Sequence, residues 1–389
     1  MSSPPTDPDE QIIRLVDDGY DMVLEGGHLV VRRLPYAGPS GVRTDGRLVL
    51  PVTYTDGVVT DASGDHRIWF AGEDPRGENG ATLGSGGQGH GFGTNESADF
   101  MLSFKPPSGA YASLSDKIRQ YARILLTAAQ HIDASVTDRP GGSFQVVPDD
   151  LPLVYPDTNT TRAGLVNLNN LFRGHTIAIV GVGGTGSFIL DHVAKTWVDS
   201  IILIDGDQFE THNAYRAPGA AADETVRSKP NKAEYFAREY SRMHTGISAH
   251  PVALTAENLH LLEGATFVFL AAADAESRPA IMRWLRDQGV PFIDVGMSFR
   301  EGEDGGLTGM AKVTIFLPDS EIALPTAPAV PPGQDDYGSN VQVAELNALN
   351  AAQAVIRWKR YLGFYATHTE SNQTVYKLYL NQLRNGDAE

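Results

Sequence analysis

Apolar and polar positions follow two different patterns along the chain, and the change falls near residue 175. From there on, short apolar runs alternate with stretches of helical periodicity near 187–197, 230–243, 277–288 and 341–361. The apolar runs are Thr176–Val180, Ile201–Ile204, Ala249–Val252, Phe267–Ala271, Phe292–Val295 and Ala311–Phe316. Strands that alternate with helices are typical of a mainly parallel sheet with helices on both faces, so we expect an α/β fold of the Rossmann-like kind here.

The first half of the chain predicts a different, smaller α+β domain over residues 11–150. Asp21–Leu24, a Gly26-Gly27 turn and His28–Arg32 favour a β-hairpin. Residues 115–132 predict an amphipathic helix capped by Ser115. Its apolar face is formed by Ile118, Tyr121, Ile124, Leu125, Ala128 and Ile132.

Residues 72–93 hold nine glycines in 22 positions, a composition that favours a flexible loop over a packed element. His90 lies in this segment with no metal-ligating residue near it in sequence, so we expect its side chain to be solvated. We expect residues 1–10 to form a disordered tail, residues 148–161 to connect the domains and residues 381–389 to form a second tail. The second domain then covers residues 151–380.

Composition excludes several classes of function. With 31 Lys and Arg against 48 Asp and Glu, the formal net charge is −17, which disfavours nucleic acid or an anionic membrane as the main partner. No apolar run reaches the roughly 20 residues of a membrane-spanning helix, and the polar N-terminus carries no signal peptide, so we expect a cytoplasmic protein. The chain has no cysteine, which excludes disulfides, thiolate zinc sites and a thiol nucleophile.

The first chemical motif is a glycine turn. Thr176–Val180 leads directly into Gly181-Val-Gly-Gly-Thr-Gly186, and Asp205 follows 24 residues after Gly181. Such a turn lets backbone N–H groups approach a phosphate at a helix N-terminus, and an acid at the end of the next strand can bind ribose hydroxyls. At this point an NAD-binding fold and a nucleotide-activating fold are both open.

The segments that follow carry cations and acids that hydride transfer does not require. They are Asp205-Gly-Asp-Gln-Phe-Glu-Thr-His-Asn-Ala-Tyr-Arg216, Ser228-Lys-Pro-Asn-Lys232 and Ala273-Asp274. Attack on an α-phosphate needs cations to neutralise developing charge and a carboxylate to hold Mg²⁺. These segments therefore favour chemistry at a phosphate. Arg278 is expected to be an ion-pair partner on a helix face rather than a catalytic group.

In combination these motifs resemble the ThiF/MoeB/E1 superfamily of adenylating enzymes, over residues 160–365. Tyr337-Gly-Ser-Asn-Val-Gln-Val-Ala-Glu-Leu-Asn-Ala-Leu-Asn350 is most similar to the E1-like proteins of bacterial ubiquitination-like operons. The resemblance implies that Arg216 and Lys232 neutralise phosphate charge, that Asp274 holds Mg²⁺ and that Arg162 reaches the ATP of a partner subunit. The residues implied to line ATP are Gly181, Gly183, Gly184, Gly186, Asp205, Asp207, Asn213 and Lys229. Asp207 and Asn213 also fit as ordinary turn residues, and Lys229 as a solvated side chain.

Many members of the superfamily pass the acyl group to a cysteine in a crossover segment, which corresponds here to residues 317–340. This chain has no cysteine. The acyl group then goes straight to a partner protein, or a hydroxyl replaces the thiol, or a cysteine has been substituted. Ser339 is the candidate hydroxyl because it precedes a helix N-terminus. Ser339 fits a plain N-cap as well. No zinc is expected, because zinc-binding members use two pairs of cysteines.

The resemblance therefore implies an E1-like enzyme that uses ATP and Mg²⁺ to adenylate the C-terminal carboxylate of a ubiquitin-like protein. It further implies transfer to an E2-like partner, a homodimer, and recognition of a partner protein by the N-terminal domain. Three alternatives stay open at this point. They are a sulfur-carrier adenylyltransferase, an NAD(P)-dependent oxidoreductase and a non-catalytic scaffold.

Overall fold

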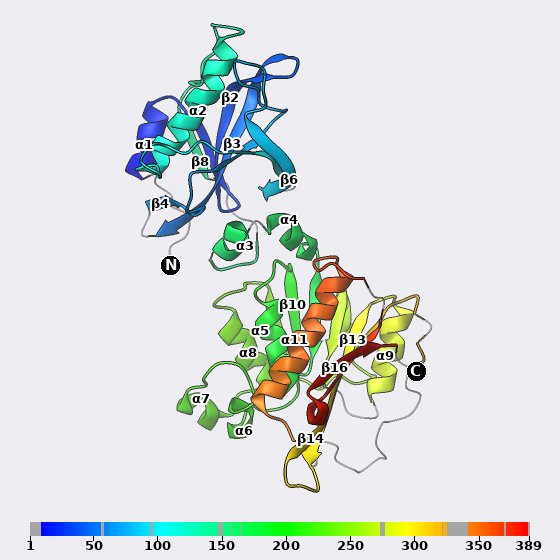
Figure 1. Ribbon diagram of the computed structural model, residues 1–389. Coiled ribbons are helices and arrows are strands. Elements are labelled where there is room, and N and C mark those ends of the chain that lie inside the picture. Colours follow the sequence, from blue (N-terminus) through cyan, green and yellow to red (C-terminus); the bar gives the residue numbers. More distant parts are fainter. Residues whose placement is uncertain are drawn as a thin grey trace. The chain divides into compact units, whose positions relative to one another are not determined.

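The structure is a computed structural model of the 389-residue chain (Figure 1). It describes residues 9–55, 58–93, 96–146, 151–155, 157–163, 165–272, 277–320, 322–324, 341–368 and 371–387. By its internal contacts the chain divides into two compact units. The first comprises Met1–Leu151 and Tyr155–Asn170, and the second comprises Pro152–Val154 and Leu171–Glu389.

The first unit is an eight-stranded sheet in the order β6-β7-β5-β3-β2-β1-β8, with β4 paired to β3. Among the described strands of this unit, only the β1–β8 pairing is parallel. The strands are β1 (Asp21–Glu25), β2 (His28–Gly38), β3 (Gly41–Thr55), β4 (Val58–Asp61), β5 (Ile68–Ala71), β6 (Gly84–Phe92), β7 (Glu96–Leu102) and β8 (Ser143–Val146). The helices are α1 (Glu10–Asp17), α2 (Leu114–Gln130), α3 (Thr158–Ala163) and α4 (Val166–Asn169).

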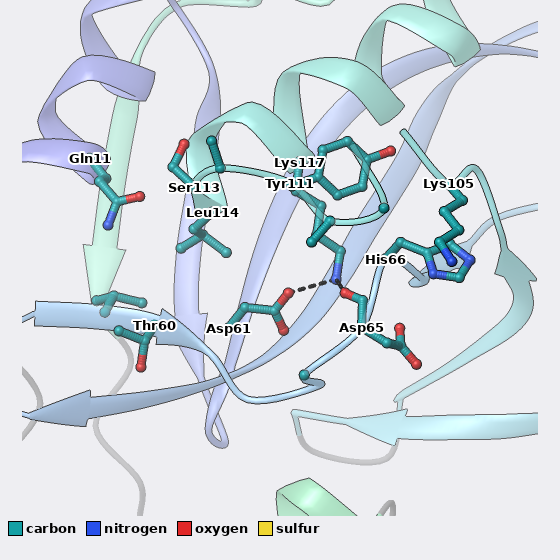
Figure 2. Close-up of a pocket in the computed structure, with 15 residues that line it drawn as sticks. Gln11, Thr60, Asp61, Asp65, His66, Lys105, Tyr111, Ser113, Leu114 and Lys117 are labelled. Carbon is teal, nitrogen blue, oxygen red and sulfur yellow. Dashed lines mark hydrogen bonds and ion pairs between the residues drawn. The ribbon is translucent and has the colours of Figure 1, made fainter. Parts of the chain in front are cut away.

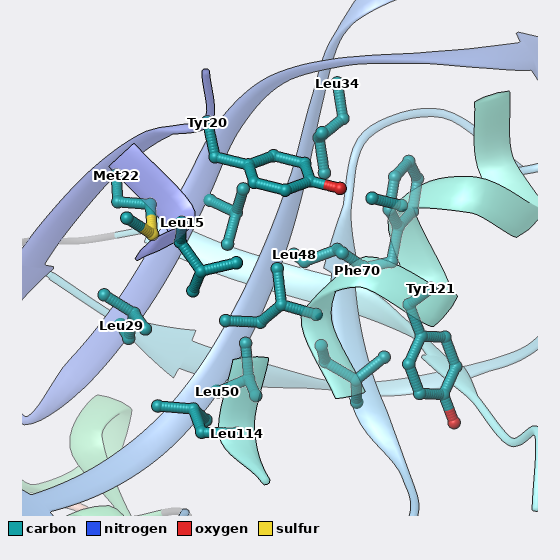
Figure 3. Packing of buried hydrophobic residues seen from close by; sticks show 14 of the residues in the cluster. Leu15, Tyr20, Met22, Leu29, Leu34, Leu48, Leu50, Phe70, Leu114 and Tyr121 are labelled. Atoms are coloured by element: carbon teal, nitrogen blue, oxygen red, sulfur yellow. The ribbon is translucent and has the colours of Figure 1, made fainter. Parts of the chain in front are cut away.

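Alternation of side chains along the strands divides the first unit into two cores. On one face Leu29 and Val31 of β2 pack with α1 and α2 in a large cluster (Figure 3), while Val30 between them belongs to a smaller cluster on the other face. The predicted hairpin of Asp21–Leu24 and His28–Arg32 is confirmed by the pairing of β1 with β2.

Helix α2 confirms the predicted amphipathic helix but not all of its details. It begins after Ser113, whose hydroxyl accepts the N–H of Asp116 at 3.0 Å, so the predicted cap Ser115 is wrong. Ser115 is buried inside the first turn. Ile132, predicted on the apolar face, lies beyond the end of the helix and is 57% exposed.

Three expectations about irregular segments are also wrong. Gly84–Phe92 of the glycine-rich segment forms strand β6, because β7 supplies an antiparallel partner whose backbone satisfies its hydrogen bonds. Gln382–Gly386 of the expected C-terminal tail forms strand β16 for the same reason, paired with β15. Of the expected N-terminal tail, residues 1–8 lie outside the described residues, whereas Asp9 caps helix α1 and Glu10 begins it.

The second unit is an eight-stranded sheet in the order β11-β10-β9-β12-β13-β14-β15-β16. Strands β11, β10, β9, β12 and β13 are parallel neighbours, and β13 to β16 are antiparallel. The strands are β9 (Thr176–Val180), β10 (Ser200–Ile204), β11 (Ile247–His250), β12 (Phe267–Leu270), β13 (Phe292–Glu301), β14 (Leu307–Phe316), β15 (Gln373–Lys377) and β16 (Gln382–Gly386). This arrangement confirms the predicted α/β fold with a preceding α+β sheet.

The helices of the second unit alternate with its strands, and those after β9, β10 and β12 connect parallel strands, as the alternating pattern predicts. They are α5 (Gly184–Val193), α6 (Thr211–Ala214), α7 (Asp223–Ser228), α8 (Lys232–Tyr240), α9 (Ser277–Asp287) and α11 (Ala344–Tyr361), with 3₁₀ turns η1 (Asn170–Phe172), η2 (Leu259–Leu262) and η3 (Leu378–Leu380). Helix α11 packs against α5 and against β13 and β14 (Figure 1). No helix in the described part of the chain is both long enough and apolar enough to span a bilayer.

Candidate functional site

The candidate site lies at the carboxyl ends of β9 and β10 in the second unit. Strand β9 has β10 on one side and β12 on the other, so the direction of the connections reverses there. Ligands of open α/β sheets bind in the crevice at such a reversal. The glycine turn of residues 181–183 follows β9 at this point and leads into α5.

The glycines of the turn are required for different reasons. Gly181 has φ +82°, and a Cβ there would lie 2.3 Å from the Cβ of Ala272. A Cβ on Gly186 would lie 1.8 Å from the carbonyl oxygen of Gly181. Gly183 differs, because a Cβ there would meet no atom of the described residues within 4 Å. The space beside Gly183 is therefore open to a ligand.

Asp205 joins the glycine turn to the strand beside it. Its Oδ2 accepts the N–H of Val182 at 2.8 Å, and its Oδ1 accepts the N–H of Asp207 at 2.9 Å. The side chain is buried, and this burial raises the pKa of the Asp205 carboxyl above its ordinary value. The two N–H bonds and the charge of Lys232 act in the opposite direction.

Lys232 is the first residue of α8 and lies next to the carboxylates of Asp205 and Asp207. Its Nζ donates to Oδ2 of Asp207 at 2.8 Å; the lysine side chain is 8% exposed and the aspartate side chain 76%. Asn231 caps the helix by accepting the N–H groups of Ala233 and Glu234. Its amide also donates to the carbonyl of Asp205 at 2.8 Å, so α8 and the end of β10 are tied together.

Asn213 and Arg216 come from the short helix α6 and the residues after it. Asn213 is 2% exposed, and its Oδ1 accepts the N–H of Glu210 at 2.8 Å. Its Nδ2 is buried and meets no hydrogen-bond partner among the described residues. The N–H of Arg216 donates to the carbonyl of Asn213 at 3.1 Å. A buried amide donor with no acceptor among the described residues is a position where a ligand oxygen fits.

The other predicted site residues have different outcomes. Lys229 is more than half exposed and its Nζ lies 2.8 Å from Oε1 of Glu210. Asp274 and Ser339 lie outside the described residues, and so does most of the predicted crossover segment. Arg162 lies in α3, and its side chain is not among those described. Arg278 forms the expected ion pair, with Asp294 of β13 at 2.8 Å.

Metal ligation is not visible in the described part of the site. Among the residues that the structure describes, no three His, Cys, Asp or Glu side chains come together as a possible metal site. The predicted ligand of Mg²⁺, Asp274, falls in the undescribed residues 273–276 that follow β12.

Sequence reasoning missed one residue at the site, Asn347 of α11. Its side chain is completely buried and bonds both to Thr185 and to the backbone of Arg216. The available signal was a polar amide at a position on the buried face of α11, a feature that Asn350 shares.

The first unit contains a cavity of about 690 Å³ between the N-terminus of α2 and the segment after β4 (Figure 2). The Nζ of Lys117 forms part of its wall and donates to Oδ2 of Asp61 at 2.6 Å, to Oγ of Ser63 at 3.1 Å and to the carbonyl of Asp65 at 3.1 Å. Because three acceptors satisfy the three donors of this ammonium, the lysine is held as part of the structure.

The expectation for His90 in the first unit is wrong. It is 6% exposed, its Nε2 lies 2.9 Å from Nε2 of His28, and its ring stacks on Trp69 at 4.8 Å between centroids. Burial lowers the pKa of His90 to about 4; burial together with the charge of His90 lowers that of His28 to about 3. The partner comes from a strand 62 residues away in sequence.

Comparison with known protein families matches two consecutive parts of the chain. Residues 10–158 match a domain of unknown function (DUF6791), and residues 157–369 match the ThiF family. Ubiquitin-like modifier-activating enzyme 5 of Caenorhabditis elegans is 38% identical over 55 residues, which span 14% of this chain and 13% of that enzyme.

Solved structures with a similar fold include MccB of E. coli with ATP and PaaA. MccB with ATP has a TM-score of 0.48 and 16% identity, over 59% of this chain and 70% of that chain. PaaA has a TM-score of 0.46 and 16% identity, over 59% of this chain and 80% of that chain. The ThiF match alone covers more than half of the sequence, and with the glycine turn at the sheet's reversal point it shows that the chain belongs to the ThiF family, in the E1-like ThiF/MoeB superfamily.

Proposed function

We propose that this protein uses ATP and Mg²⁺ to adenylate the C-terminal carboxylate of a ubiquitin-like protein. The observation that carries the proposal is the buried Lys232, whose ammonium lies at the carboxyl end of the parallel strands on a solvent-exposed aspartate. A contact chain of Val182, Asp205, Asp207 and Lys232 connects that ammonium to the glycine turn. A cation that can leave an exposed partner is suited to bind a phosphate.

The residues of the site fit ATP in four ways. The open side of Gly183 leaves room for phosphate beside backbone N–H groups at the N-terminus of α5. The Nδ2 of Asn213, which meets no acceptor among the described residues, supplies a buried donor for a phosphate oxygen. Each carboxylate oxygen of Asp205 accepts one N–H and keeps a lone pair for a ribose hydroxyl. Arg216 and Lys232 supply the positive charge.

The proposed reaction begins with an attack on the α-phosphorus of ATP. A carboxylate oxygen of the ubiquitin-like protein attacks the α-phosphorus of ATP, and the bond from that phosphorus to the β-phosphate oxygen breaks. Pyrophosphate leaves, and an acyl adenylate forms. Lys232 and Arg216 neutralise the charge that moves onto the leaving phosphates. Asp274 would hold Mg²⁺, which would supply further neutralisation of phosphate charge.

The acyl group then passes to an E2-like partner, with Ser339 as a candidate intermediate acceptor in a chain without cysteine. In that step the Oγ of Ser339 bonds to the acyl carbon, AMP leaves and the hydroxyl proton goes to solvent. The resulting oxyester is cleaved by hydroxylamine or mild base. The Ser339→Ala variant should lose a base-sensitive adduct; an intact adduct in that variant would exclude Ser339 as the acceptor.

Further parts of the proposal concern assembly. The protein acts as a homodimer in which Arg162 of one copy reaches the ATP of the other, and its N-terminal domain recognises a partner protein. Mixing an Arg162→Ala variant with an Asp274→Ala variant tests this sharing of sites. Restored activity in the mixture supports it, and activity no greater than the sum of the two variants contradicts it.

The experiment that tests the proposed function is exchange of labelled pyrophosphate into ATP, measured with Mg²⁺ and a panel of ubiquitin-like proteins. Exchange should require both a ubiquitin-like protein with a free C-terminal carboxylate and Asp274, so Asp274→Ala should abolish it. Exchange with a sulfur-carrier protein instead would favour the sulfur-carrier adenylyltransferase. No exchange from a folded protein would favour a non-catalytic scaffold.

A further inference from the structure

Asn347 connects three segments that meet at the candidate site. It lies in the first turn of α11 and is 0% exposed. Its Nδ2 donates to the carbonyl of Arg216 at 3.2 Å, and its Oδ1 accepts the hydroxyl of Thr185 at 3.1 Å. Both ends of the amide are therefore used, one by the segment that carries the arginine and one by the helix that follows the glycine turn.

The glycine turn is shaped to admit this amide. A Cβ on Gly184 would lie only 2.3 Å from Nδ2 of Asn347. Any side chain at residue 184 would therefore push α11 away or displace the amide. The absence of a side chain there is explained by Asn347 and not by a ligand, which distinguishes Gly184 from Gly183.

We propose that Asn347 is a positioning residue that holds Arg216 at a fixed place relative to the glycine turn. This inference rests on the proposed function, in which the turn and the Arg216 guanidinium bind the phosphates of one ATP molecule. Two groups that bind the same triphosphate must keep their separation, because small misplacements of binding groups greatly reduce their contribution. A buried amide with both hydrogen bonds made is a rigid way to keep it.

The same helix offers a matched control in Asn350. It is also an asparagine on the buried face of α11, 2% exposed, and its Nδ2 donates to a backbone carbonyl, that of Gly296 in β13, at 3.3 Å. Its bond leads to neither Arg216 nor the glycine turn. Asn347→Ala and Asn350→Ala therefore each remove a buried side-chain amide. Only Asn347→Ala removes a hydrogen bond to Arg216.

The experiment measures the Kd of Mg·ATP by calorimetry for both variants, in the wild-type background and in an Arg216→Ala background. Asn347→Ala should weaken binding by about tenfold when Arg216 is present and by less than about twofold when it is absent. Asn350→Ala should weaken binding by less than about twofold in both backgrounds. Equal effects of the two variants, or a loss in Asn347→Ala that persists without Arg216, would overturn the inference.

Two further measurements keep the result interpretable. Thermal unfolding of each variant shows whether it folds. If Asn347→Ala does not fold, Thr185→Val is used instead, because it removes the hydroxyl that bonds to the Asn347 amide and keeps the shape of the residue 185 side chain. The loss of Mg·ATP affinity in Thr185→Val should then depend on Arg216 in the same way. If the wild-type protein binds no Mg·ATP, the proposed function fails and the inference fails with it. If the wild type binds Mg·ATP and the dependence on Arg216 is missing, only the inference fails.

Discussion

Each of the two units contains a buried lysine paired with an aspartate, and the surroundings of the two lysines differ. Lys117 of the first unit, 2% exposed, meets three acceptors, one of which is Asp61. Lys232 of the second unit is also buried, yet among the described residues its ammonium donates to Asp207 alone. Asp207 is 76% exposed, against 21% for Asp61.

We propose that this difference separates a structural lysine, Lys117, from a phosphate-binding one, Lys232. The bonds of Lys117 are complete, so a ligand would have to replace interactions that already satisfy the ammonium. Lys232 has donors left over, and water can solvate Asp207 once the lysine leaves it. The comparison teaches that burial of a cation alone does not mark a site. In the proposed function, the feature that marks the site is a buried cation with an exposed counter-ion.

The largest expected effect comes from Lys117→Met. This change leaves Asp61 and the carbonyl of Asp65 without their buried cation, and breaking such a pair costs about 3 kcal/mol of unfolding free energy. Chemical denaturation of the full chain checks it. The affinity for Mg·ATP of the folded variant should be unchanged, and a large loss of ATP affinity would contradict the structural assignment of Lys117.

The reciprocal change, Lys232→Met, should weaken Mg·ATP binding by about 100-fold, because a phosphate loses a buried cationic partner. The methionine keeps the apolar stem of the lysine, and Asp207 becomes solvated. The free energy of unfolding should therefore change by less than about 1 kcal/mol. Calorimetry and chemical denaturation test the two halves of this prediction, and a variant that binds Mg·ATP normally would remove Lys232 from the site.

Two glycines of the turn sharpen the same contrast within the second unit. Gly186→Ala should cost about 2 kcal/mol of unfolding free energy, because its Cβ would overlap the carbonyl of Gly181. Gly183→Ala should cost less stability and weaken Mg·ATP binding by about tenfold, because its Cβ enters open space beside the turn. Parallel calorimetry and denaturation decide the matter, and equal ATP affinity of wild type and Gly183→Ala would place the phosphates elsewhere.

The smallest effect concerns pH and the histidine pair of the first unit. In the folded protein the pKa values of His28 and His90 are lowered to about 3 and about 4, below the ordinary value of 6.5. As the pH falls below about 6.5 the unfolded chain binds protons that the folded chain does not, so stability decreases. We expect a loss of about 1.4 kcal/mol between pH 7 and pH 6, about 0.7 kcal/mol from each histidine.

The control for this prediction replaces both histidines by glutamine. The double variant should show a flatter dependence of unfolding free energy on pH over that range, whatever its stability at pH 7. Identical pH dependence of wild type and double variant would mean that the pair does not titrate with folding.

Local patterning was enough to predict the parallel strands of the second unit and most of the helices between them. The apolar run Thr176–Val180 leads directly into a glycine-rich turn. Gly181 and Gly186 have no room for a side chain, so the sequence showed the strand, the turn and the start of the helix together. The strands β13 and β14 are longer than predicted, because their paired ends beyond Val295 and before Ala311 are stabilised by each other and not by apolar content.

Long-range partners explain what could not be predicted. The glycines of β6 gain order from β7, and His90 gains burial from His28, which the local sequence does not reveal. At the candidate site, the motifs predicted Asp205 and Lys232. The bonds of Asn347 to Thr185 and Arg216, which lie 162 and 131 positions earlier in the sequence, required the folded chain.

The measurement that tests the central claim most directly is pyrophosphate exchange into ATP by the wild-type, Lys117→Met and Lys232→Met proteins, with Mg²⁺ and a ubiquitin-like protein. We predict exchange in the wild type and in folded Lys117→Met, and none in Lys232→Met. Exchange that survives in Lys232→Met, or its absence from a wild-type protein that is folded and binds Mg·ATP, would contradict adenylation at this site.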